Sequence, residues 1–144
     1  MKKLTALFLV LFLTACATTT QSFDQQVGSL NIDQDDYGRM VVVRATETGD
    51  ILSNAILIGS VKSGIANDAN VIQQALSLLN QPNVVLAVAG ATDAINLAYT
   101  EQIIKQYQGQ SSATIYVKAD EAKINELKKI AEPKGITIKG RVKQ

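Results

Sequence analysis

Few residues of this 144-residue chain have the types and spacing that chemistry requires. The chain contains one cysteine, Cys16, and no histidine. The lack of histidine excludes a Ser-His-Asp triad, a Cys-His nucleophile pair and a histidine zinc site. The candidates that remain are the Cys16 thiol, the carboxylate pair Asp35-Asp36 and a polar turn from Gly90 to Asp93.

The residues before Cys16 have the three parts of a secretory signal peptide. A charged start, Met1-Lys2-Lys3, is followed by an apolar run from Leu4 to Leu13 and then by small residues. The run is too short for a membrane-spanning helix, which needs roughly 20 apolar residues. We therefore exclude residues 1–15 from the reasoning about the fold.

The tetrapeptide Leu13-Thr14-Ala15-Cys16 resembles a bacterial lipobox. In lipoproteins of that kind the thiol is acylated, and the chain is cut so that the cysteine becomes its first residue. The resemblance implies that Cys16 is lipidated, and two or more acyl chains anchor a protein stably, at about 0.8 kcal/mol per buried CH₂. In such lipoproteins an aspartate directly after the cysteine tends to keep the protein at the inner membrane. Here that residue is Ala17, so the resemblance implies the outer membrane, on its periplasmic side, with the cell surface as the alternative. The alternative is an ordinary signal peptide with a chance cysteine.

Composition limits the classes of partner. The 14 Lys and Arg residues include Lys2 and Lys3, so the part after the leader carries 12 positive and 13 negative charges. A nucleic-acid binder needs many cations against phosphate, and the absence of Trp argues against a base-stacking surface. We therefore expect no nucleic-acid partner, and the residues suggest neither a metal nor a cofactor.

Residues 16–38 are polar and poor in core-forming side chains. We expect a lipidated flexible tether there, in which Asp35-Asp36 is solvated charge. A short edge strand at Leu30-Asn31-Ile32 is the alternative. The domain organisation that we predict is a leader (1–15), the tether (16–38) and a folded domain (39–144).

Strand and helix patterns alternate along residues 39–144. Continuous or alternating apolar residues predict strands, and apolar residues at helical spacing predict helices. The segment from Asp50 to Gly59 fits a helix or, from Ala55, a strand. The other predicted elements are strands at 39–45, 83–90, 113–117 and 136–142, and helices at 68–80, 94–107 and 120–132. This order predicts a single small α/β domain with a three- to five-stranded sheet covered by three or four helices, and with the last strand at an edge.

A candidate ligand site lies where the strand at 83–90 meets the following helix. The carboxyl end of a strand and the amino end of a helix are where small ligands bind in α/β sheets. The candidate ligand-binding residues are Gly90, Thr92, Asp93 and Asn96. The alternative is a tight turn in which Thr92 or Asp93 caps the helix. One glycine is not a dinucleotide fingerprint, so no cofactor is expected here.

Residues 71–93 are similar to the centre of OmpA-like peptidoglycan-associated domains. In this chain, as in that family, an amphipathic helix ends near Asn and Pro, here Asn80 and Pro82. A Val-rich strand follows and ends in the pattern Gly-X-Thr-Asp, here Gly90-Ala91-Thr92-Asp93. The resemblance implies peptidoglycan as a ligand. The family's arginine, which pairs a carboxylate of the stem peptide, has no counterpart in the stretch 99–104.

The sequence therefore predicts a non-enzymatic lipoprotein of the outer membrane that works as an adaptor in the cell envelope. Its partner would be a protein of a secretion, pilus or transport assembly, or peptidoglycan. An enzyme acting on cell-wall or small anionic substrates is one alternative, and a purely structural tether is another. We expect Lys134, Lys139, Arg141 and Lys143 to form a solvated basic C-terminus that protects the edge strand or contacts anionic headgroups.

Overall fold

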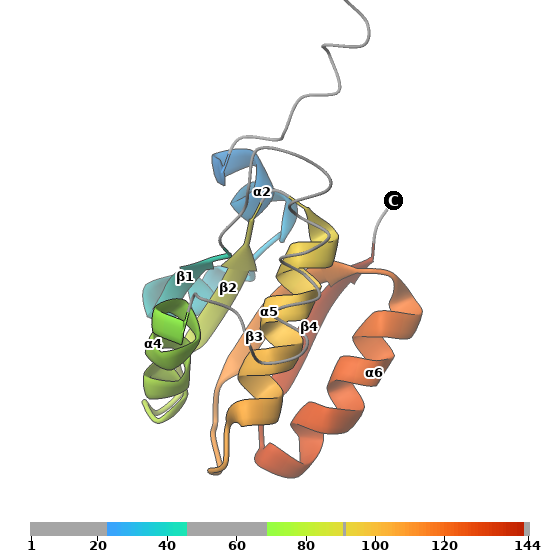
Figure 1. Ribbon diagram of the computed structural model, residues 1–144. Helices are drawn as coiled ribbons and strands as arrows, with labels where there is room; N and C mark the ends of the chain where they lie inside the picture. The colour runs from blue at the N-terminus through green and yellow to red at the C-terminus, as the bar shows by residue number, and fades with distance from the viewer. Residues whose placement is uncertain (1–22, 46–68, 91, 143–144) are drawn as a thin grey trace, which may run out of the picture.

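A four-stranded parallel sheet forms the centre of the protein (Figure 1). The computed structural model describes residues 23–45, 69–90 and 92–142. The strands follow one another in space as they do in the sequence: β1 (Met40–Arg44), β2 (Val85–Ala89), β3 (Thr114–Ala119) and β4 (Thr137–Val142). Each strand pairs in parallel with the next, with Met40 opposite Val85 and Thr114 opposite Thr137. The predicted α/β class is confirmed, and β4 is an edge strand as expected.

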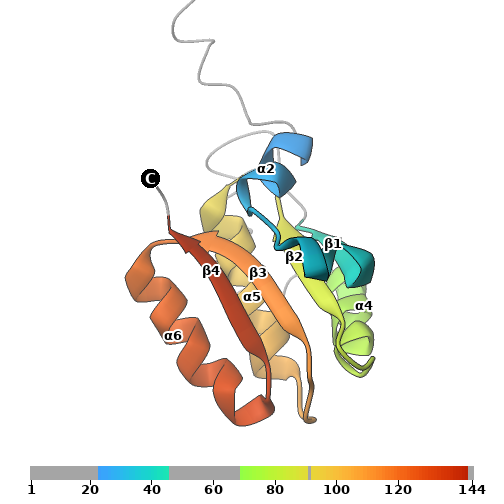
Figure 2. The ribbon, with the colours of Figure 1, turned by 180° about the vertical axis from the view of Figure 1, so that it is seen from behind.

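Three long helices cover one face of this sheet. They are α4 (Ala69–Leu79), α5 (Asp93–Gln106) and α6 (Glu121–Ala131), the last continued by the short 3-10 helix η2 (Glu132–Lys134). Each follows a strand or precedes the next one, and Figures 1 and 2 show all three on the same side. Right-handed crossovers explain this arrangement. When each new parallel strand joins the same edge of a sheet, every connecting helix lies on the same face.

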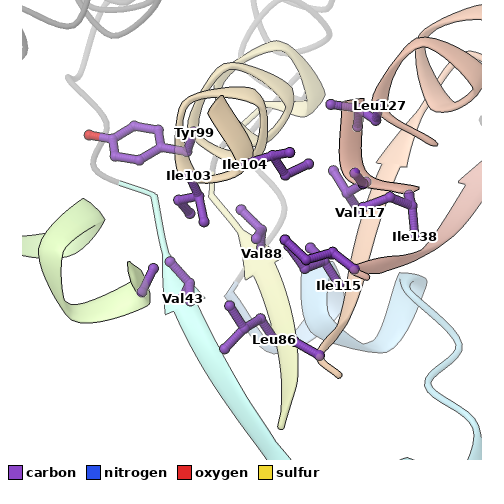
Figure 3. Close-up of a cluster of buried hydrophobic side chains, with 14 of the residues drawn as sticks. Val43, Leu86, Val88, Tyr99, Ile103, Ile104, Ile115, Val117, Leu127 and Ile138 are labelled. Carbon is purple, nitrogen blue, oxygen red and sulfur yellow. The ribbon is translucent and has the colours of Figure 1, made fainter. Parts of the chain in front are cut away.

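The main core lies between the sheet and these helices (Figure 3). Leu86 and Val88 of β2 and Ile115 of β3 point toward α5 and are fully buried. Every residue of β2 is buried, as the continuous apolar run in the sequence predicted. At about 25 cal/mol per Å² of apolar surface, this layer supplies the largest favourable contribution to folding.

The N-terminal segment covers the opposite face of the sheet, which we call the open face because no long described helix packs on it. Helix α2 (Phe23–Ser29) and the 3-10 helix η1 (Gln34–Arg39) flank Leu30 and Ile32, which pack on Val85 and Ala87 of β2. The second face of a sheet with apolar side chains needs such a cover. The folded region therefore includes the residues from Phe23 onward, whereas the sequence predicted that it begins at residue 39.

Two further expectations about this segment need correction. Leu30-Asn31-Ile32 forms no strand, since its backbone lies outside the sheet between α2 and η1. Asp36 is not solvated charge, because only 6% of its surface is exposed. Asp35, its neighbour, is exposed as expected.

The remaining predicted elements agree with the structure within a few residues. Helix α4 buries Ile72, Ala75 and Leu79 at helical spacing, and α6 buries Ile124 and Leu127 in the same way. The helix or strand expected between 50 and 61 lies outside the described residues. Among the described helices, none has the length and apolar character needed to cross a membrane.

Candidate functional site

The candidate site predicted from the sequence lies at a corner where β1 and β2 end and α5 begins. Thr92 is the N-cap of α5, and its Oγ1 accepts a hydrogen bond of 3.2 Å from the amide of Ile95. Thr92 therefore caps α5, as the alternative interpretation of this turn predicted. Because α5 is 14 residues long, its dipole also adds partial positive charge to this corner.

Gly90 lets three elements meet at this corner. A Cβ atom added to Gly90 would lie 2.8 Å from Oδ1 of Asn96, 2.9 Å from Cβ of Ala45 and 3.0 Å from the carbonyl oxygen of Ala45. Real side chains do not approach so closely, so a larger residue would push β1 or α5 away. The glycine is thus explained by close packing, whatever else the corner does.

Asn96 is the feature of the corner that packing does not explain. Its residue surface is only 5% exposed, and its Oδ1 is the one buried side-chain oxygen or nitrogen of the described residues that has no hydrogen-bond partner. A buried acceptor left unpaired costs roughly 1–3 kcal/mol. A hydrogen-bond donor at this position would recover that cost.

The structure thus brings Gly90 and Asn96 together and places Thr92 at the start of the same helix. Asp93 follows Thr92 in the first turn and is partly exposed, at the rim of the corner. The exposed Thr92 and the partly exposed Asp93 offer a hydroxyl and a carboxylate at this corner. Binding of a ligand by these residues stays a prediction.

A second polar group, which sequence reasoning missed, lies on the open face. We call it the open-face cluster: Asp33, Asp36, Tyr116, Lys139 and Arg141. The Nζ of Lys139 lies 2.7 Å from Oδ2 of Asp33 and 2.7 Å from Oδ2 of Asp36. The hydroxyl of Tyr116 lies 2.7 Å from Oδ2 of Asp36 and 2.9 Å from Oδ2 of Asp33, so it can donate to either carboxylate.

Arginines extend this cluster along the chain. Arg141 donates to the backbone carbonyls of Leu30 and Asn31, at 2.7 and 2.6 Å, and lies 3.4 Å from Oδ1 of Asp33. Arg39 pairs with Oδ1 of Asp36 at 2.8 Å. The cluster therefore fastens the segment 30–39 to β3 and β4.

The charges in the cluster support one another. The Lys139 ammonium, by hydrogen bonding above all, lowers the pKa values of Asp33 and Asp36, and the Tyr116 hydroxyl lowers them further. The two carboxylates raise the pKa of Lys139, with Asp33 the larger cause. Burial, and then the bond to Asp36, raises the pKa of Tyr116, so the phenol stays neutral and acts as a donor.

The open-face cluster is saturated with partners inside the protein, which is typical of a structural network. A weak signal for it exists in the sequence, since Lys139 and Arg141 alternate with Ile138 and so must share one face of β4. Nothing local identifies their partners, because Asp36 lies 103 residues from Lys139.

Lysine 134 also differs from the solvated role expected for it. Its Nζ donates to the carbonyls of Ile104, Lys105 and Tyr107, which end α5 without helical partners of their own. Lys134, the last residue of η2, therefore caps the end of α5, and Lys139 and Arg141 bind the N-terminal segment on the open face. Lys143 lies outside the described residues.

The described part of the chain contains no group of three or more His, Cys, Asp or Glu residues that could hold a metal ion. Comparisons with protein families, with curated proteins and with solved structures found no match for this chain. The similarity of residues 71–93 to OmpA-like domains and of Leu13–Cys16 to a lipobox therefore rests on the residues quoted above.

Proposed function

We propose that this protein is a lipoprotein of the outer membrane, anchored through Cys16, whose α/β domain acts as a non-enzymatic adaptor in the periplasm. The observation that carries the proposal is the sequence Leu13-Thr14-Ala15-Cys16 directly after a charged and apolar leader. The partner is a protein of an envelope assembly or peptidoglycan.

The start of the folded region fits a short anchor. Six residues separate Cys16 from Phe23, the first residue of α2, and an extended chain from Cys16 to Phe23 spans at most about 25 Å. Helix α2 lies beside the carboxyl end of β2 (Figure 1). In the anchored protein, this end of the domain stays close to the membrane.

The corner is then available to an adaptor as a contact surface. The corner with Gly90, Thr92, Asp93 and Asn96 lies at the carboxyl edge of the sheet, on the end that the anchor holds near the membrane. It offers the exposed hydroxyl of Thr92 and the partly exposed carboxylate of Asp93, while Oδ1 of Asn96 is buried beneath them. A ligand or partner with ammonium, amide or hydroxyl donors fits this chemistry.

Fractionation of cells that express the Cys16→Ala variant tests the anchor. We expect the wild-type chain in the outer-membrane fraction and the variant outside it, with an unchanged circular dichroism spectrum after purification. A variant that stays in the membrane fraction contradicts lipid anchoring.

A pull-down of the full chain on purified peptidoglycan sacculi, with an envelope lysate in parallel, tests the adaptor role. Retention on sacculi that is lost in Asp93→Ala assigns peptidoglycan binding to the corner. Failure to bind either sacculi or any envelope protein contradicts the adaptor role.

A further inference from the structure

A groove lies at the end of the domain opposite to α2. It runs between the second half of α4, the last turn of α5 and the loop that follows α5. Its volume is about 370 Å³, within the range of 300–1,000 Å³ typical of small-ligand sites. The residues that line it are Gln73, Leu76, Ser77, Asn80, Gln106, Tyr107, Gln108 and Gly109. We call it the amide groove.

The lining of the amide groove is polar but uncharged. Four of its eight residues carry amide side chains, and each amide offers both donors and acceptors. Ser77 adds a hydroxyl and Leu76 adds apolar surface, while Tyr107, only 5% exposed, lies beneath them. A phosphate or carboxylate ligand would need a cation in the lining, and none of these eight residues supplies one.

The floor of the groove is held in place by hydrogen bonds and close packing. The hydroxyl of Tyr107 lies 3.1 Å from Oδ1 of Asn80 and 3.0 Å from the carbonyl of Gln110. A Cβ on Gly109 would lie 2.8 Å from that hydroxyl, so only glycine fits beside it. A fixed floor lowers the entropy that binding would cost.

Other amides remain accessible above this floor. Gln73 and Gln108 are exposed, and the side chain of Gln106 donates to Oε1 of Gln102 at 3.1 Å. That bond orients the Gln106 amide toward its own helix, and the Gln108 amide donates to the carbonyl of Gln106 at 3.4 Å. Gln73 on α4 and Gln108 in the loop after α5 therefore offer a ligand contacts from two elements.

The position of the amide groove decides which ligand it meets. The ends of α4 and α5 that form it lie at the amino edge of the sheet, and α2 lies at the carboxyl edge (Figure 1). The six residues of a strand such as β3 separate the two edges by roughly 20 Å. If the proposed anchor at Cys16 is correct, on which this step rests, the groove lies on the end of the domain away from the membrane.

We propose that the amide groove binds a neutral, N-acetylated glycan strand, which at this location is the glycan of the cell wall. Sugar hydroxyls and acetamido groups alternate donors and acceptors as the lining amides do. Leu76, which is partly exposed, provides apolar contact for acetamido methyl groups. Recognition relies on amides and needs no stacked Trp, consistent with the lack of Trp in this chain.

Titration of the full-length lipidated protein in detergent micelles tests this assignment. The probe is chitohexaose, a neutral hexamer of β-1,4-linked N-acetylglucosamine, and binding is followed by calorimetry. We expect saturable binding that falls tenfold or more in the double variant Gln73→Ala/Gln108→Ala. Gln74→Ala is the matched control, because this exposed glutamine is next in sequence but lines the side of α4 that faces β1.

The assignment is overturned if chitohexaose does not bind, or if the double variant and the control bind equally well. It is also overturned if the stem peptide without glycan displaces chitohexaose. The titration does not depend on membrane attachment, so it separates the groove from the anchor. If Cys16→Ala leaves the membrane fraction but chitohexaose does not bind, the lipoprotein proposal stands and the glycan assignment is overturned. If chitohexaose binds but Cys16→Ala stays in the membrane fraction, the glycan assignment stands and the proposed anchor is overturned.

Discussion

Replacing Tyr116 by Phe tests whether the open-face cluster stabilises the fold. The substitution removes one hydroxyl and leaves the buried ring in place. That hydroxyl donates to Asp36 or Asp33, at 2.7 and 2.9 Å, and accepts a bond of 3.2 Å from the amide of Asp33. Phe keeps the apolar contacts of Tyr116 with Val85 and Ala87.

The expected cost follows from the kind of bond that is lost. A hydrogen bond to a charged group contributes roughly 1.5–3 kcal/mol. Asp36 keeps Lys139 and Arg39 as partners, and water can reach the amide of Asp33, so the value lies in the lower part of that range. We expect the free energy of unfolding to fall by about 2 kcal/mol. With an m-value of about 2 kcal/mol/M, the urea midpoint falls by about 1 M.

Urea unfolding followed by circular dichroism measures this change, and Tyr37→Phe is the matched control. Tyr37 is 58% exposed, so removal of its hydroxyl should alter stability by less than about 0.5 kcal/mol. If Tyr116→Phe shifts the midpoint no more than Tyr37→Phe does, water replaces the lost bonds. The open-face cluster then does not hold the N-terminal segment.

Three further predictions concern acid stability, the corner and the end of α5. Because the folded pKa values of Asp33 and Asp36 lie below the unfolded value of about 3.9, their contribution is present above about pH 5. It is lost as the pH falls through the folded pKa values, and urea midpoints from pH 7 to pH 3 should show a steeper acid loss in wild type than in Asp36→Asn. Gly90→Ala should cost about 1–3 kcal/mol in thermal unfolding, and part of this should return when Asn96→Ala removes the oxygen 2.8 Å from the new Cβ. Lys134→Met should lower the free energy of unfolding by about 1 kcal/mol, since helix-end carbonyls lose their donor, and amide exchange in the last turn of α5 should accelerate.

The sheet and its helices could be predicted from the sequence because local patterns determine them. The run Val84 to Ala89 is apolar throughout, and such a run forms a strand covered on both faces. Thr92 begins a helix because a threonine before Asp93 is a good N-cap. These signals depend only on neighbours in the chain, so the structure agrees with them closely.

The N-terminal cover could not be predicted in the same way. Residues 23–39 are rich in Gln and Asp, which is typical of a tether, and among residues 25–39, whose burial the structure describes, only Leu30 and Ile32 are buried apolar residues. Their place on the sheet depends on long-range bonds, such as that between Asp36 and Tyr116, 80 residues apart. No local period in a sequence carries such a pairing.

The candidate corner was located by its position in the chain, but its chemistry depends on packing. In the sequence, Asn96 is one polar residue in the first helical turn after the N-cap, and nothing near it indicates that it is buried. Its burial arises because α5 packs against the end of β1, where Ala45 lies next to Gly90. The unpaired oxygen is therefore a property of the tertiary structure. The amide groove joins residues from α4 and from the loop after α5, and it too needs the assembled fold.

The open-face cluster also sets the length of chain that an anchor at Cys16 would leave free. If the bonds to Lys139 and Arg141 were broken and residues 23–39 left the sheet, the first fixed residue would be Met40 in β1. The stretch between Cys16 and the first fixed residue would then grow from six residues to 23, and its greatest reach from about 25 to about 85 Å. If the proposed anchor is correct, the cluster thus keeps the α2 end of the domain within this shorter reach of the membrane. In the proposed lipoprotein, the same bonds that cover the sheet also direct the amide groove toward the cell wall.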